Sequence, residues 1–82
     1  MVSVSEIISM LNRGSLVEGK HDTTTYVLDY NLPQNKYVVA IRVADKTNSV
    51  AIYDRKQLTK YLKTVSSNIN WQEINQTNAH VV

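Results

Sequence analysis

Two histidines, His21 and His80, are the side chains of this 82-residue chain best suited to acid–base chemistry near neutral pH. His21 is followed by Asp22, and a carboxylate beside an imidazole could orient it as a general base. Such a base must be held in a fixed geometry by its second group. Both histidines fall in segments without a regular hydrophobic pattern, so we interpret them as surface histidines.

The remaining residue types do not form a catalytic or metal-binding set. The chain has no cysteine, which excludes a disulfide, a thiolate zinc site and a thiol nucleophile. Its seven acidic residues stand singly, and its two glycines, Gly14 and Gly19, do not make a phosphate-binding loop. No serine stands in a nucleophile elbow. We therefore expect a protein that is not an enzyme and needs neither a cofactor nor a metal.

The most informative charge pattern is a run of basic residues near the middle of the second half of the chain. Between residues 55 and 63 the four charged residues are all basic: Arg55, Lys56, Lys60 and Lys63. The rest of the chain has five basic and seven acidic residues, so the net charge of +2 comes from this segment. A basic face can bind an acidic protein patch, a nucleic acid or an anionic membrane, or can simply keep a domain soluble.

These basic residues lie on the polar side of an expected helix that begins after Asp54. Asp54 is a good N-cap, and Gln57 stands three residues later, which completes a capping box. The apolar residues then recur at the spacing of an amphipathic helix: Leu58, Tyr61, Leu62 and Val65.

A second helix is expected from about residue 4 to residue 13. Ser3 and Glu6 form its capping box, and Gly14 suits the position after its last turn. The same helical spacing places four apolar residues on one side: Val4, Ile7, Ile8 and Leu11.

Between the two helices, alternating β-branched and aromatic residues predict three strands, at about residues 23–30, 36–43 and 50–53. Residues 15–22 read as a loop. After the second helix, the segment around Trp71 could form either one further helical turn or a short strand over Asn68–Trp71. We expect one α+β domain over residues 1–75, with α-β-β-β-α order, a three-stranded antiparallel meander and both helices on one face. Residues 76–82 are expected to be a disordered tail.

The two faces of this sheet are expected to differ in role. The helices would cover Tyr26, Leu28, Val39, Ile41, Val50 and Ile52. The open face would show Val27, Val38, Ala40, Arg42, Ala51 and Tyr53. Because arginine and tyrosine are enriched at interface hot spots, we predict that Arg42 and Tyr53 bind a partner, together with the four basic residues of the second helix. A partner protein or a second copy could cover this face, or the segment with Trp71 and Ile74 could pack there.

Nucleic-acid binding is the alternative function. The order α-β-β-β-α resembles that of double-stranded RNA-binding domains, which place a basic second helix against the RNA backbone. In that family the second helix begins with a segment rich in glycine and lysine. In this chain the corresponding segment is Asp54-Arg55-Lys56-Gln57. The four basic residues could still hold phosphates without sequence preference.

The chain also resembles the small accessory proteins of tailed phages, in particular the soluble antiholins of T-even phages. The likeness lies in its length, its single domain, its lack of cysteine and its polar end. This resemblance implies a cytoplasmic regulatory protein that binds the soluble part of a membrane holin and delays lysis. It assigns no functional residue. The first residues, Met1-Val2-Ser3-Val4, lack the basic start and apolar run of a signal peptide, which also favours the cytoplasm.

Overall fold

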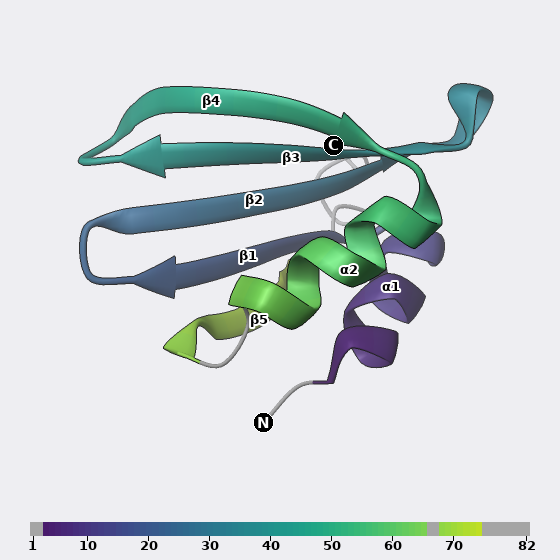
Figure 1. The fold of residues 1–82 in the computed structure, drawn as a ribbon, viewed down its shortest axis with the longest axis horizontal. Coiled ribbons are helices and arrows are strands. Elements are labelled where there is room, and N and C mark those ends of the chain that lie inside the picture. Colours follow the sequence, from purple (N-terminus) through teal and green to yellow (C-terminus); the bar gives the residue numbers. More distant parts are fainter. Residues whose placement is uncertain (1–2, 66–67, 75–82) are drawn as a thin grey trace, which may run out of the picture.

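The chain folds into an α+β structure with two helices and a five-stranded antiparallel sheet (Figure 1). The computed structural model describes residues 3–65 and 68–74. The sheet order is β4-β3-β2-β1-β5, so β4 and β5 are the edge strands. In chain order the elements are α1 (Val4–Asn12), β1 (Leu16–His21), β2 (Thr24–Asn31), the 3-10 helix η1 (Leu32–Gln34), β3 (Lys36–Val43), β4 (Lys46–Tyr53), α2 (Arg55–Val65) and β5 (Asn70–Ile74).

Local sequence signals position both helices, as expected. At α1 the Ser3 hydroxyl accepts the Glu6 N–H at 3.2 Å, and the Glu6 carboxylate accepts the Ser3 N–H at 3.2 Å. At α2 the Asp54 carboxylate accepts the Gln57 N–H at 2.8 Å, and the Gln57 side-chain oxygen accepts the Asp54 N–H at 3.0 Å. Each capping box satisfies two N–H groups that the first turn of a helix leaves unpaired. The predicted starts of both helices are confirmed.

The expected three-stranded meander is wrong, because two more strands extend the sheet. β1 (Leu16–His21) occupies the segment that was expected to be a loop, and it pairs with β2. β5 (Asn70–Ile74) pairs with β1 on its other side, so the strand is the correct alternative for the segment around Trp71. The expected tail over residues 76–82 lies outside the described residues.

Gly19 lies at the contact between β1 and β5, the two strands that were not predicted as such. Glycine is unfavourable in a strand, which made this segment read as a loop. In the structure Gly19 lies opposite Trp71, and a Cβ atom added to it would come within 2.6 Å of the indole ring. The indole therefore packs on the bare backbone of β1, and this tertiary contact outweighs the low strand propensity.

Both helices cover the same face of the sheet, which we call the inner face. Ile7 and Leu11 of α1 and Leu58 and Leu62 of α2 are fully buried. They belong to one hydrophobic core with the inner-face residues Val17, Leu28, Tyr37, Val39 and Trp71. The expectation that one face carries both helices is confirmed, and the opposite face carries neither.

A β-bulge in β4 decides which of its residues face the helices. Beyond the two-residue turn the strands pair Val43 with Lys46 and Arg42 with Thr47, but then the register shifts and Asn48 has no partner. An extra residue reverses the faces of everything that follows it in a strand. Val50 therefore lies opposite Ala40 rather than Val39, on the face away from the helices.

The expected faces of β4 are consequently wrong. Val50 and Ile52 were expected in the core, yet they lie on the open face and are 59% and 60% exposed. Ala51 and Tyr53 were expected on the open face, yet they lie opposite Val39 and Tyr37 on the inner face.

Candidate functional site

The face of the sheet opposite the helices, which we call the outer face, carries a contiguous set of apolar residues. Val27, Ala40 and Val50 are neighbours across β2, β3 and β4, and Val38 is the neighbour of Ile52 in the next row. Directly opposite residues of antiparallel strands have their side chains in contact on the same face. On β2, β3 and β4 the apolar outer-face residues are Val27, Val38, Ala40, Val50 and Ile52.

Polar side chains surround this apolar set. Asp29 lies opposite Val38, Glu18 lies opposite Val27, and Arg42 lies one row beyond Ala40. Arg42 is exposed, and its Nη2 donates to the carbonyl oxygen of Asp45 at 3.2 Å. This bond holds the arginine beside the β3–β4 turn, and the strand register places Arg42 on the open face, as predicted.

Tyr53 does not lie beside Arg42. It points to the helices, and its ring packs on Tyr61 of α2 with centroids 5.4 Å apart. The pKa of the Tyr61 hydroxyl is raised, mainly by burial and further by Tyr26 and Tyr53 nearby. The structure thus places Tyr53 in the packing between α2 and the sheet, and its expected position on the open face is wrong.

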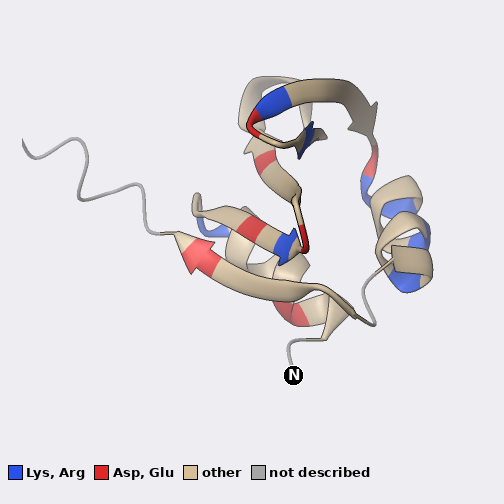
Figure 2. Ribbon diagram, turned by 90° about the vertical axis from the view of Figure 1, so that its left-hand side faces the viewer, with Lys and Arg blue, Asp and Glu red and all other residues tan. Residues whose placement is uncertain are grey.

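The four basic residues of α2 form the second candidate surface, as expected. Successive helix residues are rotated by about 100°, which brings Lys56, Lys60 and Lys63 to the side opposite the buried leucines. The basic residues are blue along α2 in Figure 2. A shallow groove of about 560 Å³ is lined by Arg55, Lys56, Thr59, Lys60 and Lys63.

No carboxylate neutralises this basic surface within the described part of the chain. Among residues 3–65 and 68–74, the ion pairs within 4.0 Å are Arg13–Glu73, Lys20–Glu18 and His21–Asp22. The positive charges of α2 are therefore available to an anionic group from outside.

The structure keeps the two candidate surfaces apart. Arg42 lies opposite Thr47 near the start of β4, whereas Arg55 follows the end of β4 (Figure 1). The six predicted partner-binding residues thus divide into the α2 group, the isolated Arg42 and the packed Tyr53. Sequence reasoning missed Val50 and Ile52 as surface residues, and the signal that could have revealed them is the polar Asn48 beside a two-residue turn.

The histidines and acidic residues do not form a catalytic centre in the part described. His21 is exposed at the β1–β2 turn, with its Nε2 3.7 Å from an Asp22 carboxylate oxygen, and His80 lies outside the described residues. Across the described ranges, no group of three or more histidine, aspartate and glutamate side chains is placed to hold a metal ion. None of the described helices has the length and apolar character required to cross a bilayer.

Comparison with models of known protein families, with curated proteins and with solved structures finds no match to this chain. The function must therefore be inferred from its own surfaces.

Proposed function

We propose that this protein is a small regulatory protein that acts by stoichiometric binding to a partner protein, and that the outer face is the contact surface. The observation that carries this proposal is the exposure of Val50 and Ile52 at 59% and 60% beside other apolar side chains. Single exposed apolar residues are ordinary on a protein surface, but a contiguous apolar set marks a contact site.

The arrangement of the outer face supports a protein as partner. Antiparallel sheets with one solvated face usually alternate apolar and polar residues, and β2 follows this rule with Thr25 and Asp29 around Val27. On β3 and β4 the rule fails, because both faces are apolar over Val38–Ala40 and Val50–Ile52. An apolar centre with a polar rim of Glu18, Asp29 and Arg42 has the composition of a protein interface.

The resemblance to soluble antiholins favours one kind of partner, the cytoplasmic segment of a membrane holin. In that case the protein would work in the cytoplasm, where the basic α2 surface suits the anionic inner leaflet. Binding would shift the partner away from assembly, without chemistry or a cofactor.

The test compares capture of partners from the native host by three baits. They are the wild type, Ile52→Asp and the matched control Val43→Asp, which introduces the same charge at an apolar residue that is 39% exposed and in phase with Val39 on the other face. A protein retained in stoichiometric amount by the wild type and the control, but lost with Ile52→Asp, supports the proposal. Equal retention by all three folded baits contradicts it.

We infer nucleic-acid binding as the second candidate, because the four cations of α2 have no carboxylate partner among the described residues. Phosphate contacts predict that affinity for any duplex falls steeply as salt rises. A gel-shift series from low to physiological salt tests this, and the absence of retardation at low salt removes it.

A further inference from the structure

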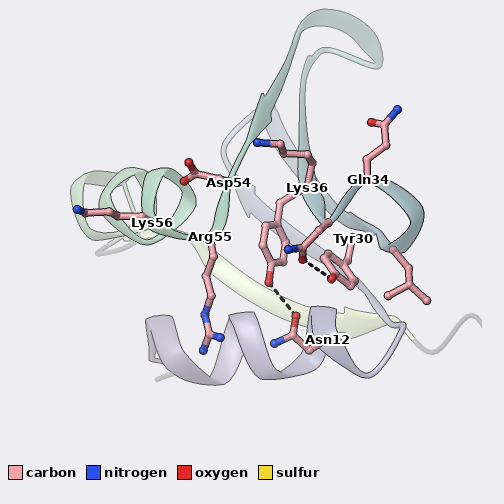
Figure 3. A pocket seen from close by; sticks show the side chains of 10 residues that line it. Asn12, Tyr30, Gln34, Lys36, Asp54, Arg55 and Lys56 are labelled. Carbon is pink, nitrogen blue, oxygen red and sulfur yellow. Dashed lines mark hydrogen bonds between the residues drawn. The ribbon is translucent and has the colours of Figure 1, made fainter.

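We propose that the cleft between α1, η1 and the start of α2 binds a small phosphate-bearing ligand with an organic part, of about nucleotide size. This site is separate from the outer face and does not depend on the function proposed above. The cleft has a volume of about 700 Å³, within the range of small-molecule sites. Its lining comes from α1, β2, η1, β3 and the start of α2 (Figure 3).

The charges of the lining favour an anion. Three basic residues, Lys36, Arg55 and Lys56, line the cleft with a single acid, Asp54. One carboxylate oxygen of Asp54 already accepts the Gln57 N–H of the helix cap. In Figure 3 the Arg55 side chain extends from α2 toward α1, while Lys56 points away from the cleft. Arg55 is therefore the cation that extends toward Asn12 of α1, and Lys36 adds positive charge to the lining.

Two tyrosines orient the neutral polar groups so that hydrogen-bond donors remain. The Tyr37 hydroxyl donates to the side-chain oxygen of Asn12 at 2.8 Å, and the Tyr30 hydroxyl donates to that of Asn35 at 2.7 Å. Both amide oxygens are thus engaged. Neither side-chain NH₂ group has an acceptor among the described residues, so the cleft offers donors from Asn12 and Asn35 beside those of Arg55.

A phosphate group matches these donors, one charged guanidinium and two side-chain amides, better than a neutral ligand does. Its oxygens accept several hydrogen bonds at once, and those from charged donors are the stronger ones. Tyr37 brings these groups together, since it is nearly buried and its hydroxyl bonds Asn12 beside Arg55. Burial raises the pKa of Tyr37, and the positive charge of Arg55 partly opposes this rise.

The tyrosine side of the cleft can hold the organic part of the ligand. The rings of Tyr30 and Tyr37 lie with their centroids 4.8 Å apart, and the exposed Leu32 stands beside them on η1. An aromatic and aliphatic wall in a cleft with a cationic lining suits a ring that carries a phosphate, because a planar ring can pack on tyrosine.

The test is a titration of the isotope-labelled wild type with ADP, pyrophosphate and adenosine at low ionic strength, read from amide chemical shifts. We expect ADP and pyrophosphate to shift residues that line the cleft, and ADP to bind more tightly than adenosine by about tenfold or more. Arg55→Gln should weaken ADP by about tenfold, as the loss of a charge-assisted contact implies. Lys60→Gln is the matched control on the same helix, since Lys60 does not line this cleft, and should leave the affinity within about twofold.

Several outcomes would overturn the proposal. These are no shift at about 5 mM ADP, shifts that spread along α2, or equal weakening by Arg55→Gln and Lys60→Gln. A short RNA duplex that binds while ADP does not would assign the basic surface to nucleic acid instead. Both variants must keep the dispersed spectrum of the wild type, so a failure to fold is recognised directly.

Discussion

Both faces of the sheet carry apolar residues on β3 and β4, but the helices cover only one of the two faces. On the inner face Leu28 is fully buried, and Val39 beside it contacts the same core. On the outer face Val50 and Ile52 of the neighbouring strand β4 remain exposed. Residue type alone therefore does not separate a core from a contact surface. The position of the helices and the register of the strands decide which apolar face is buried.

This comparison predicts that stability depends on the inner face and binding on the outer face. Leu28→Ala should lower the free energy of unfolding by about 2–5 kcal/mol, because it leaves a cavity in a close-packed core. The exposed outer-face change Ile52→Ala should cost less than about 1 kcal/mol. Urea unfolding of both variants measures the difference, and similar losses would contradict the assignment of the faces.

Gly19→Ala should have the next largest effect, since it acts where the inner face reaches the edge of the sheet. The added methyl group would lie within 2.6 Å of Trp71, so the indole must move. We expect a loss of about 1–3 kcal/mol, as for other overpacked sites, and a red-shifted emission from the single tryptophan. Unchanged stability and emission would mean that the indole does not rest on the β1 backbone.

Tyr37→Phe should have a smaller effect, at the border between the core and the cleft. It removes the hydrogen bond to Asn12 and keeps the buried ring. The expected cost is about 0.5–1.5 kcal/mol, measured by urea unfolding against Tyr30→Phe, whose hydroxyl bonds the exposed Asn35. If Tyr30→Phe lowers the free energy of unfolding more than Tyr37→Phe does, the buried Tyr37 hydrogen bond is not the more stabilising of the two.

The smallest expected effect is a pH dependence at β5. The pKa of Glu73 is lowered, first by the hydrogen bond from the Ser15 hydroxyl and then by that from Arg13. A carboxyl group whose pKa is lower in the folded chain stabilises the fold fully above its unfolded pKa, near 4.5. This contribution is lost as the pH falls through the folded pKa.

Glu73→Gln should therefore flatten the acid side of the stability profile without changing its shape near neutral pH. Unfolding of the two proteins between neutral pH and the acid range provides the measurement. Parallel profiles would show that Glu73 does not hold β5 in this way.

The sequence allows local features to be predicted and leaves non-local ones open. Both helices follow from the capping boxes at Ser3 and Asp54, whose partners stand three residues away. β1 could not be predicted, because Gly19 belongs in a strand only through its contact with Trp71, far along the chain. The face of Val50 depends on one unpaired residue, Asn48, whose only sign in the sequence is a polar side chain close to the turn.

The candidate sites show the same division. The basic side of α2 is predictable, because four cations of one helix need only the helical repeat to meet. The apolar outer face was assigned to the wrong residues of β4, since its register was unknown. The cleft was not foreseen, because Asn12, Lys36 and Arg55 come from three different elements.

The central claim, that a partner protein covers the outer face, is tested most directly by methyl NMR with a paramagnetic cosolute. In the free protein the cosolute should broaden the methyl signals of Val50 and Ile52 and spare those of Leu28 and Val39. When the captured partner is added in equimolar amount, we predict that Val50 and Ile52 become protected. If they stay as accessible as in the free protein while the partner is bound, the outer face is not the contact surface.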